Sequence, residues 1–114
     1  MLDYKVLDRH QLEQFVQTNE FEGTEHGAEV SFIVVDWPAG HRVPLHRHAY
    51  PEIFIVQEGQ ATYTVGSATL EVKAPQVIVA AANVPHAFVN SGEGRLKQVD
   101  IHVSPRIVTE WLET

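Results

Sequence analysis

The sequence predicts an all-β fold, a sandwich or a barrel, and two observations predict it. First, residues 29–103 contain short segments rich in Val, Ile, Phe and Thr, which favour strands. Second, turn-forming residues separate these segments at short and regular intervals, as is typical of sandwiches and barrels. The expected strands are EVSFIVVDW (29–37), EIFIVQEG (52–59), ATYTVG (61–66), ATLEV (68–72), QVIVAA (76–81), AFVN (87–90) and LKQVDIHV (96–103).

A short helix is expected at each end of the chain. Asp8 followed by Gln11 has the spacing of a capping box, and the apolar residues after it predict a helix over about 9–18. Ser104 stands as an N-cap before a proline, which predicts a second helix over about 105–113. The apolar face of this second helix would consist of Ile107, Val108, Trp111 and Leu112.

Size and charge narrow the function. With 114 residues the chain fits one domain, residues 1–114, and without cysteine it has neither disulfides nor thiolate ligands. Eight basic residues against fifteen acidic ones, a net charge of −7, argue against nucleic acid and anionic membranes as partners. No stretch has the length of a signal peptide core or a membrane span, so we expect a cytoplasmic protein that acts on a small molecule.

Residues 40–59, GHRVPLHRHAYPEIFIVQEG, contain a candidate metal site. His46 and His48 are two residues apart, so on an extended chain both side chains point to the same face, and Glu52 has the same parity. His86, at the start of a later strand, could reach across a barrel as a fourth ligand. Nitrogen and oxygen ligands in this combination suit Fe, Mn, Co, Ni, Cu or Zn better than Mg or Ca.

The same stretch resembles the first motif of the cupin superfamily, a glycine, His-x-His, a glutamate and a second glycine at fixed spacings. It stands here as Gly40, His46, His48, Glu52 and Gly59. The second motif is half present: His86 and Asn90 match, and the other three positions hold Pro75, Ala81 and Asn83 in place of Gly, Pro and Gly.

This resemblance implies a small jelly-roll barrel over about residues 29–104, with one divalent transition metal per chain held inside it. Carried over by position, the ligands would be His46, His48, Glu52 and His86. About two positions of an octahedral shell would stay open for water, substrate or dioxygen. Asn83 is a mild departure from the motif, because asparagine tolerates the left-handed conformation of a turn glycine.

Further candidate residues lie near the motif. Glu52 could also act as a base. His41 could carry protons at the cavity mouth, although we expect it in solvent. Gln98, Asp100 and His102 share one face of a strand, which we expect in water, with the apolar face inward; the reverse would make Asp100 and His102 an acid–base pair.

Four aromatic residues could line a substrate pocket, although such side chains are more often plain core. Tyr50, beside the histidine pair, could hydrogen-bond a ligand or pack on its neighbours. Trp37 and Trp111 are expected to serve packing or an interface. The other candidate pocket residues are Phe54, Tyr63 and Phe88, with Asp100 beside them.

Two classes of function fit this pattern. The first is a metal-dependent enzyme on a small oxygenated metabolite, dioxygenase-like by the resemblance, with isomerase or lyase chemistry as alternatives. The second is a module that binds a sugar or sugar acid without changing it. An open sheet edge and the two terminal segments favour a homodimer in either case.

Overall fold

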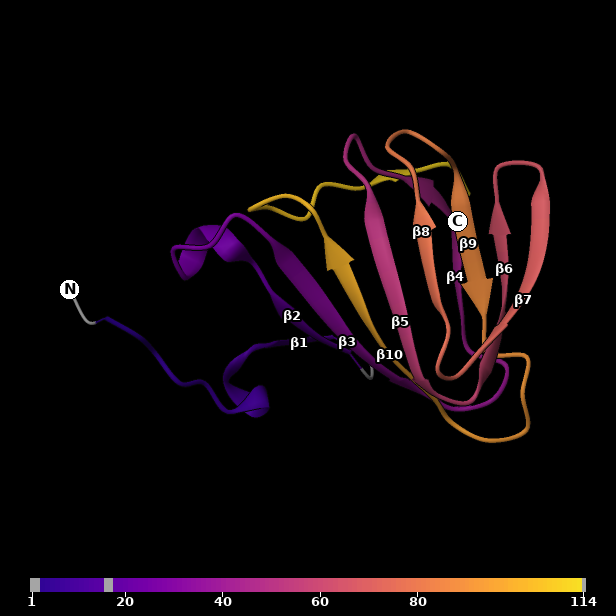
Figure 1. Ribbon diagram of the computed structural model, residues 1–114, viewed down its shortest axis with the longest axis horizontal. Helices are drawn as coiled ribbons and strands as arrows, with labels where there is room; N and C mark the ends of the chain where they lie inside the picture. The colour runs from indigo at the N-terminus through magenta and orange to yellow at the C-terminus, as the bar shows by residue number, and fades with distance from the viewer. Residues whose placement is uncertain (1–2, 16–17, 114) are drawn as a thin grey trace.

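The computed structural model describes residues 3–15 and 18–113, and these form two antiparallel sheets that pack face to face (Figure 1). This arrangement confirms the all-β jelly-roll prediction. The six-stranded sheet has the order β1 (Glu13–Phe15), β2 (Thr18–Phe21), β3 (Ser31–Trp37), β10 (Leu96–His102), β5 (Glu52–Glu58) and β8 (Val77–Ala80). The five-stranded sheet has the order β11 (Glu110–Trp111), β4 (Arg42–Arg47), β9 (His86–Val89), β6 (Gln60–Val65) and β7 (Ala68–Lys73).

The helix predicted at 9–18 is wrong over the part that the structure describes. The Asp8 N–H donates to Gln11 Oε1 at 2.8 Å, as in a capping box, but only one 3₁₀ turn follows, η1 (Arg9–Gln11). The chain then enters β1, which pairs with β2, and β2 pairs with β3. A helix this short is marginal alone, so pairing with an existing sheet prevails. Residues 16 and 17 lie outside the described part.

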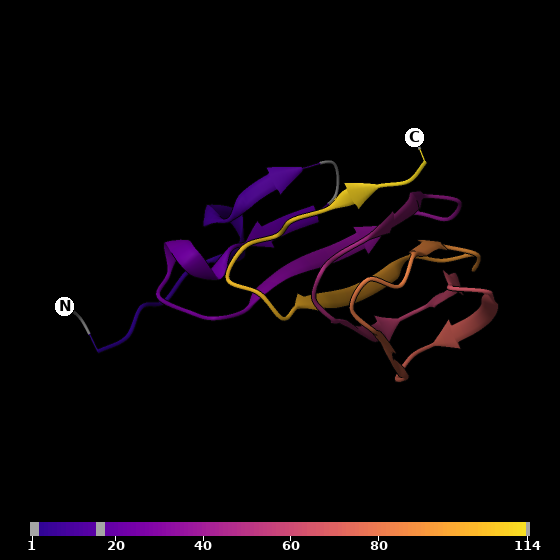
Figure 2. The ribbon, with the colours of Figure 1, turned by 90° about the horizontal axis from the view of Figure 1, so that it is seen from above.

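The helix predicted at 105–113 is also wrong. This segment is extended, ends in β11 and runs lengthwise along the molecule (yellow in Figure 2). β11 pairs with β4, with Trp111 opposite His46, and the N–H groups of Leu112 and Glu113 donate to Leu45 O at 3.0 and 3.1 Å. These long-range hydrogen bonds satisfy the backbone better than an isolated short helix would. Besides η1 and a second 3₁₀ turn, η2 (Gly23–Glu25), the described residues hold no helix, so none could cross a membrane.

The apolar core fills one end of the space between the sheets. Phe54 and Tyr63 are fully buried, with ring centroids 5.1 Å apart, and Phe88 stacks on Tyr63 at 5.1 Å. Leu96 and Val56 close the same end. Because these rings occupy the interior there, the remaining space between the sheets lies at the other end, where the polar residues gather.

The polar face of β10 points inward, contrary to the expectation from the sequence. Gln98, Asp100 and His102 are at most 3% exposed, whereas Val99 and Ile101 lie on the outer face. The inversion is tolerated because the buried polar groups bond one another, which offsets their loss of water. The outer face of the six-stranded sheet is apolar as a result.

Two turn residues have a left-handed backbone conformation, which few side chains allow. Gly59, which ends the first motif, has φ +84° and lies against Arg95 O, where any Cβ would overlap. Asn83 has φ 67° and donates its N–H to His48 O at 2.7 Å, so the asparagine performs the role of a turn glycine. This bond ties the loop before β9 to the chain between β4 and β5.

Candidate metal centre

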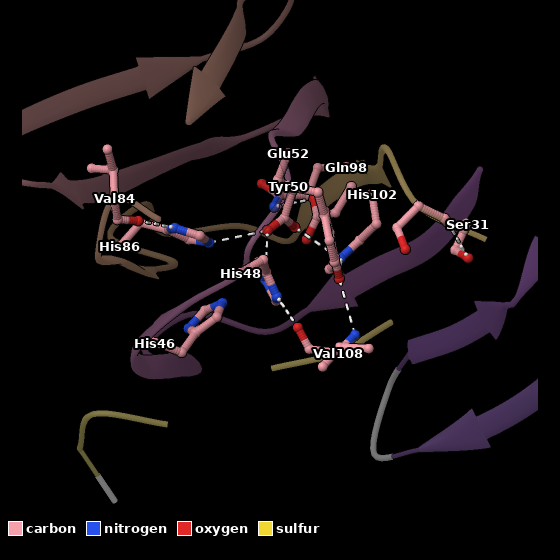
Figure 3. A network of polar contacts seen from close by, with 12 residues as sticks. Ser31, His46, His48, Tyr50, Glu52, Val84, His86, Gln98, His102 and Val108 are labelled. Atoms are coloured by element: carbon pink, nitrogen blue, oxygen red, sulfur yellow. Dashed lines mark hydrogen bonds and ion pairs between the residues drawn. The ribbon is translucent and has the colours of Figure 1, made fainter. Parts of the chain in front are cut away.

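Four side chains from three strands and one loop meet between the sheets (Figure 3). His46 in β4 and His86 at the start of β9 are register partners in the five-stranded sheet. Glu52 begins β5 in the facing sheet, and His48 follows β4. All four are buried, and one ligand atom from each lies within 4.8 Å of all the others. His86 thus lies beside His46, and Glu52 reaches across from the opposite sheet.

Backbone carbonyls fix the tautomers of the three histidines. The Nδ1 atoms of His46, His48 and His86 lie 2.7, 2.8 and 3.0 Å from the carbonyl oxygens of Pro44, Val108 and Val84. A carbonyl oxygen only accepts, so each Nδ1 carries the proton and donates it. Each neutral ring therefore keeps its lone pair on Nε2, the arrangement found when histidine binds a metal.

The contacts of Glu52 indicate that a cation belongs in this cluster. Its Oε1 lies 3.1 Å from His48 Nε2 and 3.0 Å from His86 Nε2. Two imidazole nitrogens lie this close to one carboxylate oxygen only when a positive charge lies among them, either a proton on an imidazole or a bound cation. His48 Nε2 is buried and has no hydrogen-bond partner among the described residues. Three imidazole nitrogens and one carboxylate suit a divalent transition metal.

The electrostatic environment acts differently on the members of the cluster. Burial lowers the pKa of His46 to about 4, so the ring is neutral at pH 7. Burial also works to lower the pKa of His48, but hydrogen bonds with Glu52 and the Val108 carbonyl outweigh it and raise that pKa. Burial alone would raise the pKa of Glu52, but hydrogen bonds from His102, His48 and His86 outweigh it and hold that pKa well below its usual range. His46 and Glu52 therefore need lose no proton before they coordinate a cation, whereas a metal would replace a proton held between His48 and Glu52.

His102 differs from the other three histidines in its tautomer. The Val108 N–H donates to the Tyr50 hydroxyl oxygen at 3.1 Å, so the single hydroxyl proton is free to point to His102 Nδ1, 2.7 Å away. The His102 proton is then on Nε2, which lies 3.1 Å from Glu52 Oε2 but outside good hydrogen-bond geometry. His102 and Glu52 are register partners, so His102 positions the carboxylate from the adjacent strand.

A second chain of hydrogen bonds ends beside the cluster. The Tyr63 hydroxyl donates to Gln98 Oε1 at 2.7 Å, and Gln98 Nε2 donates to Asp100 Oδ1 at 2.7 Å. Burial raises the pKa of Asp100 well above its ordinary value, and the charge of Glu52 adds to the effect. The protonated form of Asp100 is therefore favoured beside an ionised Glu52.

A cavity of about 460 Å³ opens beside three of the four candidate ligands, His46, His48 and Glu52. Of the residues considered from the sequence, Phe88, Asp100 and His102 line it. Phe54 and Tyr63 lie in the core, and Tyr50 stacks on His48 at 5.0 Å, so none of these three lines the cavity. The lining residues are Thr18, Glu20, Ile33, Val35, Trp37, Val43, His46, His48, Glu52, Phe88, Asp100, His102, Ile107, Thr109 and Trp111.

Sequence reasoning missed the contribution of the last segment and of both tryptophans. Ile107, Thr109 and Trp111 alternate along an extended segment and all line the cavity, a period of two that the helical interpretation hid. Trp37 lines it as well. His41 is half-buried, with its ring 4.8 Å from that of Trp37, and is not among the lining residues.

Known proteins are similar to this chain in sequence and in fold. Residues 33–102 match the family model for the cupin domain. Auxin-binding protein 4 of Zea mays is 34% identical over 89 residues, which are 69% of this chain and 44% of that protein, so the chain spans less than half of its relative.

Two solved structures show the same fold at low identity. A conserved Klebsiella pneumoniae protein with a double-stranded β-helix domain superposes with a TM-score of 0.77 at 16% identity, over 98% of this chain and 100% of that one. Bacillus subtilis oxalate decarboxylase, described with Mn(II) centres, gives 0.76 at 19% identity, over 83% of this chain and 27% of that one. With the family match over residues 33–102, these observations show that the chain belongs to the cupin family.

Proposed function

We propose that His46, His48, Glu52 and His86 hold one divalent transition metal per chain and that the protein is an enzyme acting on a small oxygenated metabolite. The carrying observation is the shared Nδ1–H tautomer of the three histidines, which leaves each Nε2 for a metal, together with four candidate ligand atoms within 4.8 Å of one another. Without a cation this buried cluster would be costly, and with one it is complete.

The reaction that we propose is dioxygenase-like, on a diketone, catechol, hydroxy acid or sugar acid. When bound, the metal would supply Lewis acidity toward substrate oxygens and, as iron, reactivity with dioxygen. Around it, Glu52 is a ligand and a possible base, and Asp100 holds a proton at the cavity wall. The same residues would support isomerase or lyase chemistry, which also requires a proton to move beside a polarised carbonyl.

A non-catalytic binding module is the second candidate, and the maize relative favours it because its name describes ligand binding. Such a module would keep the metal and the cavity but release its ligand unchanged. The Mn(II) centres of the oxalate decarboxylase support manganese as one metal to test, beside iron, zinc, nickel, cobalt and copper.

Turnover separates the two candidates. Protein loaded in turn with Fe(II), Mn(II) and Zn(II) would be incubated with diketones, catechols and hydroxy acids, while oxygen uptake and products are measured. Oxygen consumption or product formation that requires metal would support the enzyme. Saturable binding by calorimetry with no product for any bound compound would contradict it and support the module.

We also propose a homodimer of single-domain chains, 1–114, in the cytoplasm. The terminal segments that favoured a dimer in the sequence pair within the chain, β2 with β3 and β11 with β4. The outer face of the six-stranded sheet supports the dimer, because its cross-strand neighbours are apolar and Val77 and Val79 are 56% and 61% exposed. Those neighbours form two rows, Val79, Ile53, Ile101 and Phe32, and Val77, Ile55, Val99 and Val34.

A further inference from the structure

The cavity beside the candidate metal centre is polar at the candidate ligands and mostly apolar elsewhere. Beyond the histidines and Glu52, aliphatic side chains of both sheets and of the last segment face it. Trp37 and Phe88 stack at 5.1 Å on one wall, and the Trp111 ring lies 5.1 Å from the His46 ring. A ligand bound at the centre would therefore have its remaining atoms in an apolar and partly aromatic surrounding.

Acidic groups line the cavity, but basic side chains with a permanent charge do not. The carboxyl groups are Glu20, Glu52 and Asp100, of which Asp100 favours its protonated form, and none of the described lining residues is Lys or Arg. The sequence has neither Lys nor Arg at 1–2, 13–17 or 114. Cations of the chain are engaged elsewhere: Arg47 pairs with Glu110 at 2.8 Å, and Arg95 pairs with Asp36 at 2.6 Å.

The charge balance limits what this site can accept. A divalent cation with one carboxylate ligand, Glu52, retains one unit of positive charge, which a single ligand anion neutralises. A second anionic group on the ligand would lie between apolar walls and near Glu20, without a cation to pair with. An unpaired charge in such a place costs several kcal/mol.

We propose that this site selects ligands with an apolar, ring-sized body and at most one negative charge, and that it discriminates against dicarboxylates. The proposal rests on the proposed metal centre and adds the chemical class of ligand. A volume of about 460 Å³ suits a body of this size, whereas a very small dicarboxylate would leave most of the apolar wall in contact with water.

A matched pair of ligands tests the proposal. Zinc-loaded protein would be titrated calorimetrically with 4-methylphenylacetate and with 4-carboxyphenylacetate, which differ only in the group at the far end of the ring. We expect the methyl compound to bind at least about tenfold more tightly, because only the other compound carries a second charge into the apolar part. Equal or tighter binding of the dicarboxylate, or no binding of the methyl compound, would overturn the proposal.

A charge introduced into the wall provides an independent measurement. Thr109→Lys places a cation on the lining, and we expect it to raise the affinity for 4-carboxyphenylacetate and to reduce the ratio between the two ligands. Val103→Lys adds the same charge at an exposed position that does not line the cavity and should leave the ratio unchanged. An equal effect of both variants would contradict the assignment to the cavity.

The metal is measured before any ligand is added, which separates the two claims. Protein that retains no zinc contradicts the proposed metal centre itself. Protein that retains zinc but prefers the dicarboxylate leaves the centre standing and overturns only the proposed ligand class.

Discussion

The position of one proton on each imidazole divides the histidines of this cavity into two kinds. His46, His48 and His86 donate Nδ1–H to backbone carbonyls and turn a lone pair inward. His102 accepts a hydrogen bond from the Tyr50 hydroxyl at Nδ1 and turns its own N–H toward Glu52. Tyr50 remains a donor at all ordinary pH values, because burial raises its pKa to about 12. In the proposed metal centre, the four histidines thus provide three candidate ligands and one positioning residue.

Removal of the Tyr50 hydroxyl should weaken the metal site without removal of a ligand. In Tyr50→Phe, His102 loses the donor that fixes its tautomer, so Glu52 Oε2 loses a positioned partner. We expect metal affinity to fall by about 10- to 100-fold, and the EPR spectrum of the Mn(II)-loaded protein to change. Tyr63→Phe also removes a buried hydroxyl but leaves His102 and Glu52 intact. Its spectrum should match the wild type, and an equal change would contradict the positioning role.

Stability in the absence of metal should depend on pH through His46. Its pKa is lowered to about 4 in the folded chain and is about 6.5 when unfolded, so between these values the unfolded chain binds more protons. The free energy of unfolding should therefore fall as the pH drops from about 6.5 to about 4, by up to about 3 kcal/mol from this group. Urea denaturation of metal-free protein at several pH values measures it. His46→Asn should show a flatter dependence over this window, and an unchanged slope would argue against the assignment.

The chemistry of the ligands could be predicted from the sequence because the spacing of the motif suffices for it. Strand parity is a weaker guide, since β4 ends at Arg47 and the residues between His48 and Glu52 are not in a strand. The facing of Gln98, Asp100 and His102 could not be read in the same way. Alternation along the strand shows that these three residues share a face, but it does not show whether that face points into the barrel. In the structure the polar face points inward, where its groups hydrogen-bond one another, and Val99 and Ile101 lie on the outer face.

At the scale of elements, the segment after β10 completes the metal centre. The Val108 carbonyl orients His48, its N–H orients Tyr50, and the alternate residues Ile107, Thr109 and Trp111 form a cavity wall. One extended segment therefore orients both the candidate ligand His48 and Tyr50, the residue that fixes the tautomer of His102.

Deletion of residues 106–114 tests this assignment. We expect the deleted protein to retain its β-sheet circular dichroism but to bind metal about 10- to 100-fold more weakly, because His48 loses the acceptor at Nδ1. Arg47→Ala serves as the control. It breaks the ion pair between Arg47 and Glu110, which is exposed and screened by solvent, and should leave metal affinity near the wild type. Equal losses in both proteins would contradict the role of the Val108 backbone.

The terminal elements show where local sequence patterns fail. Both ends carry helix signals, a capping box at Asp8 and an N-cap before Pro105, and both become extended because neighbouring strands offer hydrogen bonds to the backbone. Pairing partners distant in sequence, such as Trp111 and His46, cannot be read from a local pattern. The central strands were predictable because their β-rich composition and their turns agree.

At the scale of the whole molecule, the outer face of the six-stranded sheet is the expected dimer surface. Val79→Lys places a charge on the edge strand of this apolar face, at its most exposed valine, so we expect it to shift the protein from dimer to monomer in light scattering at micromolar concentration. Leu70→Lys changes an exposed apolar residue of the five-stranded sheet and should leave the dimer intact. A monomeric wild-type protein, or dissociation by Leu70→Lys alone, would contradict this surface.

Metal content is the measurement that tests the central claim most directly. Untagged protein purified without a metal column would be analysed by mass spectrometry, beside His86→Asn and the control His41→Asn, whose ring is outside the cavity lining. We expect about one transition metal ion per chain in the wild type and in His41→Asn, and an affinity loss of about 100-fold or more in His86→Asn. Wild-type protein without metal after reconstitution, or His86→Asn with a full complement, would contradict the account.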